Sequence, residues 1–226
     1  MNDAIKVNYT VVGTAYAVSK VLNSLPDTVA LDFEAASIFT DLQRKTMKEQ
    51  LETLDKTRHP KKYRELRSKV ASSALTHPKY VQITHLAIGL SETEAIVVVF
   101  TSPQIEKIVM KWLTTTKTMQ IWHNLSYDGR LIHHRTGLLP INYEDTQILA
   151  KTIVNHVEIY KAKTGLKDLA GAKYGDWGIS TDNFVMTNLW DEKVIEYTAI
   201  DGCATFWVYN SIQRHIAEMR EMEDEK

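Results

Sequence analysis

Two acidic residues interrupt a strongly apolar segment near the start of the sequence. Residues 29–33 read Val-Ala-Leu-Asp-Phe, and Glu34 follows them. Such a segment is typical of a buried strand, and strand alternation places the side chains of Asp32 and Glu34 on the same face. Two neighbouring carboxylates are unfavourable there unless a cation such as Mg²⁺ or Mn²⁺ compensates their charge or water reaches them. The chain must therefore fold so that this strand end meets either a metal site or solvent.

The order of the predicted elements indicates the fold class. Segments rich in β-branched and aromatic residues alternate with segments whose apolar residues recur at helical spacing. Strands are predicted at residues 9–12, 29–33, 80–90, 94–100 and 119–123, with a short one ending at Asp145. Helices are predicted at residues 15–25, 104–114, 127–135, 146–154 and 165–174, with a long one from about Asp191. This alternation is typical of an α/β fold with a central sheet flanked by helices.

Residues 41–78 differ in composition from the rest of the sequence. Between residues 41 and 80 there are eleven Lys and Arg against five Asp and Glu, although the whole chain has a net charge of only −1. The segment has few large apolar residues, and Pro60 lies between two stretches of helical character. We therefore predict a single domain over residues 1–226 that carries a basic, helical insertion at about residues 41–78.

Composition excludes several classes of protein. No run approaches the roughly 18 apolar residues of a membrane span. Residues 1–20 lack the charged start and apolar block of a signal peptide. Cys203 is the only cysteine, so the chain can form neither an intrachain disulfide nor a cysteine-based zinc site. The sequence thus predicts an intracellular protein that does not span a membrane.

Two further segments place acids at the start of a helix and on a helix face. In residues 122–128, Trp-His-Asn-Leu-Ser-Tyr-Asp, a predicted strand ends and Asp128 begins the next helix. In residues 196–201, Glu-Tyr-Thr-Ala-Ile-Asp, Tyr197 and Asp201 are four residues apart and share one helix face. Small neighbours such as Ala199 and Gly202 allow that face to approach a sheet closely. Taken alone, the first segment also matches an ordinary helix N-terminus, and the second a surface Tyr and Asp.

Together, the three acidic segments resemble the motifs of the DnaQ-like exonuclease superfamily, of the DEDDy type. The first motif is similar to LDFEA, the second to HNLSYD, and the third, Y-x-x-x-D, to YTAID, in the same order. Two further segments also resemble the corresponding segments of this superfamily: residues 144–146, Glu-Asp-Thr, and residues 165–170, GLKDLA. The likeness is strongest to the proofreading exonuclease domain of family A DNA polymerases. It implies a ribonuclease H-like fold with a central mixed sheet. The sequence departs from the usual exonuclease domain in two places, the basic insertion and Phe33.

The resemblance implies a metal site and a set of substrate contacts. Four carboxylates would bind two divalent ions, Mg²⁺ or Mn²⁺, with the first bridging both: Asp32, Glu34, Asp128 and Asp201. Tyr197 would orient the attacking water, since an ordinary tyrosine pKa of about 10 is too high for a base at neutral pH. Contacts with the terminal nucleotide are expected from Phe33, Ile38, Asn124 and Tyr197. Packing and turn formation account equally well for Ile38 and Asn124.

The basic insertion is expected to contact phosphates electrostatically, without sequence preference. Seven of its residues are candidates: Arg44, Lys45, Lys48, Lys61, Lys62, Arg64 and Arg67. A solvated pair of helices would account for the same charges.

The function that these expectations favour is metal-dependent removal of nucleoside monophosphates from a free 3′ end of DNA. No polymerase domain fits on a chain of 226 residues, so proofreading would require a separate DNA polymerase as partner. One alternative is RNA 3′-end processing of the ribonuclease D kind, with the same four carboxylates and tyrosine. Another is a non-catalytic module that binds a nucleic-acid end or a partner protein. A compact stand-alone nuclease would also suit a virus or phage.

Overall fold

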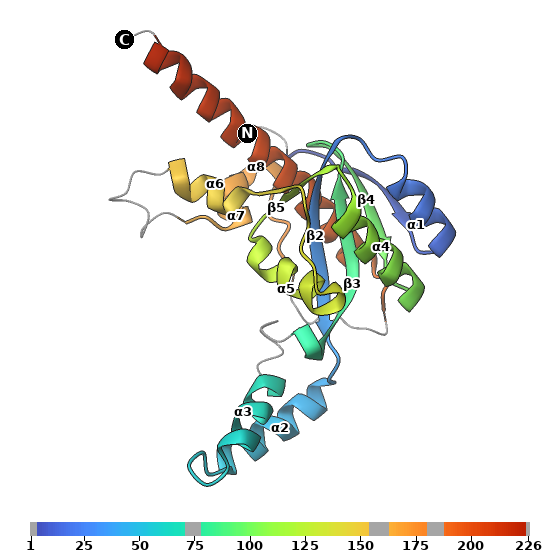
Figure 1. The fold of residues 1–226 in the computed structure, drawn as a ribbon, viewed down its shortest axis with the longest axis vertical. Helices are drawn as coiled ribbons and strands as arrows, with labels where there is room; N and C mark the ends of the chain where they lie inside the picture. Colours follow the sequence, from blue (N-terminus) through green and yellow to red (C-terminus); the bar gives the residue numbers. More distant parts are fainter. Residues whose placement is uncertain (1–3, 71–77, 154–162, 180–187, 225–226) are drawn as a thin grey trace.

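A six-stranded mixed sheet with helices on both faces forms the body of the molecule (Figure 1). The computed structural model describes residues 4–70, 78–153, 163–179 and 188–224. The strand order is β1-β4-β3-β2-β5-β6, and the strands are β1 (Asn8–Val12), β2 (Thr28–Ser37), β3 (Val81–Gly89), β4 (Glu94–Val99), β5 (Met119–Trp122) and β6 (Tyr143–Asp145). The predicted α/β class with a central mixed sheet is therefore confirmed.

Strand β2 lies inside the sheet and carries the first acidic motif. It pairs antiparallel with β3 and parallel with β5, so hydrogen-bonded neighbours flank it on both sides. A β-bulge falls between Glu34 and Ala35, and the Thr84 hydroxyl of β3 donates to the Glu34 carbonyl there at 3.1 Å. Bulges re-aim side chains and are common beside functional sites. Here the bulge comes directly after the second acid.

Helices α1 (Ala15–Leu22), α4 (Pro103–Thr115) and α5 (Leu125–Thr136) cover one face of the sheet. The Thr14 side chain caps α1 by accepting a hydrogen bond from the Ala17 amide, and Pro103 occupies the first turn of α4. Proline suits this position because the first N–H groups of a helix have no partner within it. The core on this face joins β2, β3 and the three helices through buried residues that include Leu31, Ile83, Val109, Leu131 and Ile132.

Helix α8 (Glu192–Asp224) crosses the other face of the sheet at close range. The residues that allow this approach are small: Ala199, Gly202, Cys203 and Ala204. A Cβ atom added at Gly89 of β3 would collide with the Gly202 carbonyl. Helices α6 (Thr146–Ile153) and α7 (Leu166–Ala170) pack beside α8, whose C-terminal part extends beyond the body (Figure 1). Neither α8 nor any other helix among the described residues is long and apolar enough to cross a membrane.

Helices α2 (Asp41–Thr53) and α3 (Pro60–Val70) form a two-helix projection, here called the arm, which extends away from the sheet at the end of β2 (Figure 1). A capping box formed by Thr40 and Gln43 begins α2. At the root of the arm, the Ile38 amide donates to the Tyr80 carbonyl at 3.0 Å, and the rings of Phe39 and Tyr80 lie 5.6 Å apart. The predicted helical insertion is thus confirmed over residues 41–70, while residues 71–77 lie outside the described residues.

The predicted helix at residues 165–174 differs from the observed structure. The chain forms the short helix α7 and then a 3-10 helix, η3 (Gly171–Tyr174). Gly171 has φ +59°, outside the helical region, and this conformation ends α7. The segment therefore forms two short helices instead of one long helix, and α7 packs against α8.

Candidate active site

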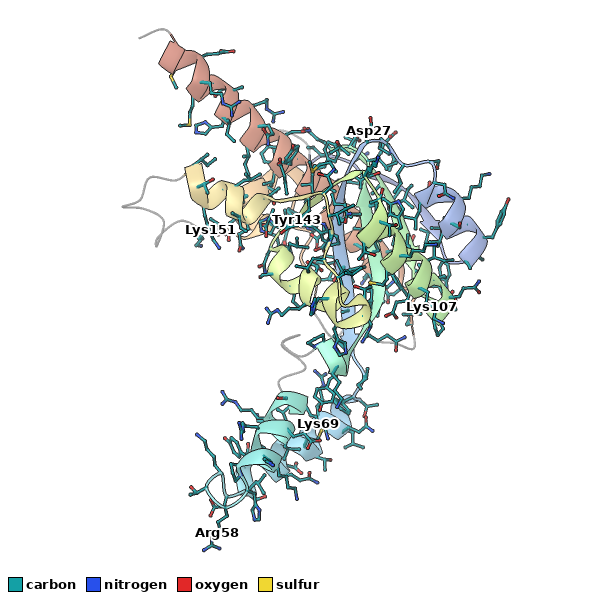
Figure 2. All side chains as sticks on the ribbon, viewed as in Figure 1. Asp27, Arg58, Lys69, Lys107, Tyr143 and Lys151 are labelled. Atoms are coloured by element: carbon teal, nitrogen blue, oxygen red, sulfur yellow. The ribbon has the colours of Figure 1, made fainter. Side chains whose placement is uncertain are left out.

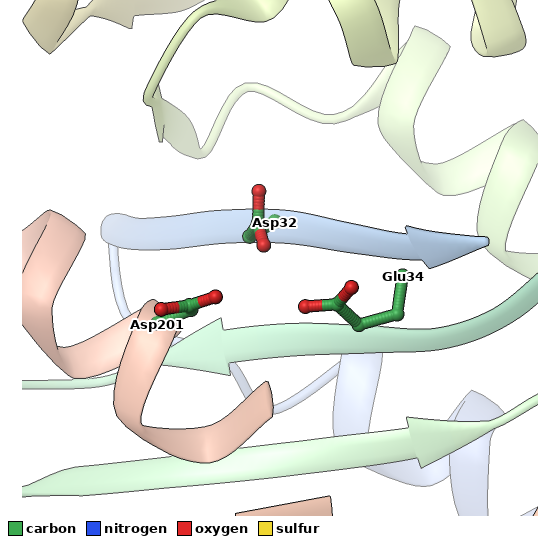
Figure 3. A group of neighbouring side chains, drawn as sticks. All are labelled: Asp32, Glu34 and Asp201. Atoms are coloured by element: carbon green, nitrogen blue, oxygen red, sulfur yellow. The ribbon is translucent and has the colours of Figure 1, made fainter. Parts of the chain in front are cut away.

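Three carboxylates from two distant segments converge where α8 crosses β2. Strand alternation turns Asp32 and Glu34 toward α8, and Asp201 projects from the helix toward them (Figure 3). One ligand oxygen from each of the three lies within 4.8 Å of the others. Asp201 is buried, whereas Asp32 and Glu34 are partly exposed. The structure thus brings together three of the four predicted ligands, and two of these side chains are partly exposed to solvent.

The fourth carboxylate, Asp128, lies in the first turn of α5 and is buried. The turn before it is unusual, because Asn124 adopts a left-handed conformation with φ 62°. Asp145, at the end of β6, accepts hydrogen bonds from the Asn124 amide at 3.1 Å and the Leu125 amide at 2.9 Å. An acid that accepts from the first N–H groups of a helix stabilises that end. Asp145 therefore fixes the start of α5 and, through it, the position of Asp128.

Burial and mutual repulsion raise the pKa of the carboxyl groups. For Asp32 and Glu34 the loss of hydration is the largest cause, and the neighbouring carboxylates add to it. Burial also raises the pKa of Asp128 to about 8, although hydrogen bonds from main-chain N–H groups, including that of Phe33, oppose the rise. Without a cation, these groups therefore retain protons at a pH where ordinary carboxyl groups are ionised.

Asp201 belongs to a cluster of side chains that adjusts its charge. The Trp177 indole donates to Asp201 Oδ1 at 2.6 Å, and the Tyr197 hydroxyl also hydrogen bonds to this carboxylate. The Lys167 Nζ lies 4.9 Å from the centre of the Tyr197 ring and 5.7 Å from that of Trp177. Burial raises the pKa of Asp201, and the two hydrogen bonds and the Lys167 charge oppose the rise. This cluster stabilises the ionised form of Asp201.

The carboxylates fit a divalent metal ion. Glu34 Oε1 and Asp128 Oδ1 are buried, and neither has a hydrogen-bond partner among the residues that the structure describes. A buried carboxylate oxygen without a hydrogen-bond partner is unfavourable. Two such oxygens in the same group of acids therefore indicate that a ligand binds there. All four side chains offer hard oxygen ligands, which suit Mg²⁺ and Mn²⁺ better than softer metals. Asp32, Glu34, Asp128 and Asp201 are thus the residues that would hold such ions.

The other residues predicted to contact the substrate differ in how exposed they are and in the element that carries them. The Phe33 ring lies on the face opposite the acids, 3% exposed, with its centre 5.7 Å from the Trp122 ring and 6.2 Å from the Phe100 ring. This position does not agree with the predicted substrate contact, because the alternation that aligns Asp32 and Glu34 turns Phe33 into the core. Ile38 follows the last residue of β2 and is 48% exposed. The seven basic candidates lie on the arm.

Several residues of the site are not among the residues predicted from the sequence. Lys167 and Trp177 lie far from the acids in sequence, and only the GLKDLA likeness marked the neighbourhood of Lys167. The half-buried Tyr127 is a third. Its buried hydroxyl has no hydrogen-bond partner among the described residues, and burial followed by the charge of Asp128 raises its pKa. Contacts between segments so far apart depend on the path of the chain, which local patterns do not reveal.

Solved structures of several nucleases have a fold similar to that of this chain. No family model and no curated protein matches the sequence. NrnC of Brucella melitensis bound to pGG matches with a TM-score of 0.58 at 14% identity, over 98% of this chain and 86% of that one. NrnC with bound Mg²⁺ has a TM-score of 0.53 at 15% identity, over the same shares of the two chains.

Two trypanosomal structures agree with this result. RNase D from Trypanosoma brucei matches with a TM-score of 0.53 at 17% identity, over 89% of this chain and 63% of that one. The catalytic core of RRP6 from the same organism matches with a TM-score of 0.52 at 15% identity, over 95% of this chain and 48% of that one. The chain has a ribonuclease H-like fold. The predicted DEDDy-type resemblance is thereby confirmed for the fold, while the link to polymerase proofreading is not.

Proposed function

We propose that this chain is a metal-dependent 3′–5′ exonuclease that removes nucleoside monophosphates from the end of a nucleic acid. The observation that carries the proposal is the convergence of Asp32, Glu34 and Asp201, with Asp128 near enough for its charge to raise the pKa of the first two. Buried oxygens of Glu34 and Asp128 have no hydrogen-bond partner among the described residues. Perturbed acids that gather where solvent can enter are typical of catalytic sites. The ribonuclease H-like fold supports this proposal, because the predicted motifs resemble those of exonucleases with that fold.

In this proposal the acids hold the metal ions and Tyr197 positions the water. Two divalent ions bound by the carboxylates would activate a water molecule and stabilise the leaving 3′ oxygen. Burial, and then the nearby charges of Asp201 and Glu34, raise the pKa of Tyr197, so its hydroxyl stays protonated. A protonated hydroxyl that already donates its proton to Asp201 can still accept a hydrogen bond from a water molecule. Tyr197 therefore orients the nucleophile and does not remove its proton.

Two substrate classes follow from different observations. The likeness of the three motifs to a proofreading domain favours a DNA 3′ end, with a separate DNA polymerase as a possible partner in that case. The similar solved structures instead include RNase D and RRP6, as well as NrnC bound to pGG, and these favour RNA or very short strands. The carboxylates would hold the metal ions, and the metal ions would act on the phosphodiester, so this part of the site suits either sugar. We infer a 3′–5′ exonuclease in both cases.

Digestion of end-labelled strands tests the proposal. A 5′-labelled DNA strand incubated with Mg²⁺ or Mn²⁺ should give a ladder of products shortened one nucleotide at a time, and EDTA should stop the reaction. The same strand as RNA, compared at equal enzyme concentration, measures which sugar is preferred. Asp32→Ala should abolish both activities, while Asp27→Ala, an exposed acid at the other end of β2, should retain them. Binding without cleavage of either strand would instead identify a non-catalytic module.

A further inference from the structure

The arm presents a row of positive charges along one side of α3. Lys61, Arg64 and Arg67 are exposed and follow one another at intervals of three residues. Residues at this spacing are neighbours on a helix surface. Tyr63, Leu66 and Val70 are half-buried and form the opposite side of α3, toward α2. We call the first three residues the cationic stripe. Glu65, four residues after Lys61, forms its ion pair with Lys69.

The cationic stripe is distinct from the other charges of the arm. Arg58 and Lys69 pair with Asp55 and Glu65, at 3.5 Å and 2.7 Å. No ion pair between a stripe residue and an acid is found in the part of the chain that the structure describes. Arg64 Nε donates a hydrogen bond to the Pro60 carbonyl of the same helix at 3.3 Å. The stripe is therefore free to bind an external anion.

Four of the seven predicted phosphate contacts fit this role less well. Arg44 is half-buried on the side of α2 that faces α3. Lys45 and Lys48 share their side of α2 with Glu52, which offsets their charge. Lys62 projects from the flank of α3 that also carries the paired Lys69. Helix geometry thus divides the basic candidates and selects Lys61, Arg64 and Arg67.

Packing within the arm does not explain why three basic residues follow one another on the surface of α3. No residue of α3 is fully buried, and α2 and α3 contact each other through a narrow half-buried seam. Three like charges in a row repel one another and weaken a helix when no anion is present. A strand of nucleic acid supplies evenly spaced negative charges that relieve this repulsion.

The arm is attached to the strand that carries the acids. β2 ends at Ser37, three residues after Glu34, and α2 begins four residues later. In Figure 2, Arg58 marks the far tip of the arm and Lys69 lies near its root, so α3 returns from the tip toward the body. A strand whose 3′ end lies at the carboxylates could therefore continue along α3. The thirteen-residue helix α2 alone is about 20 Å long, so only a strand of several nucleotides would reach the stripe.

We propose that the cationic stripe binds the phosphates of a single strand whose 3′ end occupies the carboxylate site. This inference rests on the proposed exonuclease function and adds a preference for long single strands over very short ones. Because each residue contacts the backbone and no base edge, the grip carries no sequence preference. It also makes affinity for long strands fall with salt concentration.

Binding and turnover of strands of different length test the stripe. The variant Lys61→Gln/Arg64→Gln/Arg67→Gln keeps good helix formers at all three positions. Its charge-matched control, Lys20→Gln/Lys107→Gln/Lys111→Gln, neutralises three exposed lysines of α1 and α4. Anisotropy of a labelled oligo(dT) of about 20 nucleotides and of a labelled dinucleotide, both in EDTA, measures binding without cleavage. KM for the same two substrates in Mg²⁺ measures the effect on turnover.

The stripe variant should bind the long strand at least fivefold more weakly, about the loss expected for exposed phosphate contacts, and should bind the dinucleotide as the unmodified protein does. The slope of log affinity against log salt should become shallower by about two, since each contact with a single strand contributes about 0.7. Unchanged binding of the long strand, or an equal loss in the control variant, would overturn the proposal. Since binding is measured in EDTA, absence of hydrolysis would contradict the exonuclease function alone.

Discussion

The acids of the candidate site repel one another whenever no cation lies between them. Their raised pKa values mean that the folded protein binds protons at these groups more tightly than the unfolded chain does. The stability that this provides is complete below about pH 4, where the unfolded carboxyl groups are protonated. It is lost as the pH rises through the folded value, which is about 8 for Asp128. A bound metal ion replaces the protons and removes the loss.

The melting temperature in EDTA should therefore fall between about pH 5 and about pH 9, and Mg²⁺ should raise it more at the upper end of this range. Differential scanning fluorimetry of the same protein in EDTA and in Mg²⁺ measures both trends. In the Asp32→Asn variant, one repelling charge is absent, so the fall in EDTA should be smaller and the effect of Mg²⁺ should largely disappear. A Mg²⁺ effect that does not depend on pH would show that the ion binds elsewhere.

A second prediction concerns the tyrosine. Tyr197→Phe removes the hydroxyl but keeps the ring under the Lys167 ammonium group. Because the hydroxyl orients water and transfers no proton, kcat should fall by less than the factor of about 10² that lost proton transfer typically costs. Asp201→Asn removes a metal ligand and should reduce kcat to the level of Asp32→Ala. Single-turnover rates at saturating Mg²⁺ compare the variants, and an equal loss in both would contradict the assigned roles.

At the scale of single elements, the contact between α8 and β3 controls the position of two site residues. Gly89→Ala places a methyl group against the Gly202 carbonyl and should push α8, with Tyr197 and Asp201, away from the sheet. Overpacking of this kind costs about 1–3 kcal/mol, measured as the free energy of unfolding in denaturant. The Mg²⁺ concentration for half-maximal stabilisation should rise in parallel.

Gly129→Ala is the matched control for this prediction. An added Cβ at Gly129 in α5 would lie 3.5 Å from the nearest atom, an ordinary contact. Since alanine is a better helix former than glycine, the variant should be neutral or up to about 1 kcal/mol more stable. If Gly89→Ala behaved in the same way, the close approach of α8 would not be the feature that positions Asp201.

The elements themselves were largely predictable from the sequence, because most depend on local patterns. Pro103 after Ser102 begins a helix as expected, and the apolar run at residues 29–33 forms a strand of the predicted sheet. The break at Gly171 was missed, since a positive φ is not evident from composition. The strand order was also beyond reach, because β1 pairs with β4 through contacts more than eighty residues apart.

The site was predictable where its chemistry is carried by motifs. The sequence predicts the four carboxylates and Tyr197 as site residues from their spacing and the resemblance, and the structure brings Asp32, Glu34 and Asp201 together. Lys167 and Trp177 join them only because α7 packs against α8, which no local pattern encodes. Phe33 was assigned by its place in a motif, although strand alternation directs it into the core.

At the scale of the whole molecule, the arm should be separable from the body. Ser37 of β2 pairs with Val81 of β3, and the Ile38 amide bonds to the Tyr80 carbonyl, so the chain leaves and re-enters the sheet at adjacent points. Replacing residues 39–79 by Asn-Gly, which favours a two-residue hairpin turn, should connect β2 to β3 directly. The shortened protein should keep Mg²⁺-dependent hydrolysis of a dinucleotide and lose its preference for long strands.

Circular dichroism and fluorimetry of the shortened protein provide the control. A cooperative transition that still responds to Mg²⁺ would show that the sheet and the acids remain in place. Failure to fold would instead show that the body depends on the arm for its stability.

The adjacent strand ends at the root of the arm have a consequence for how such a protein can diversify. An insertion between two paired strands leaves their register intact, so it can lengthen, shorten or change its charge without altering the acids on β2. If the arm selects the polymer and the acids hold the catalytic metal ions, as proposed, selection on substrate choice and selection on hydrolysis act on different stretches of the same gene. A descendant could change its substrates by replacing the arm and keep the acids of β2 unchanged.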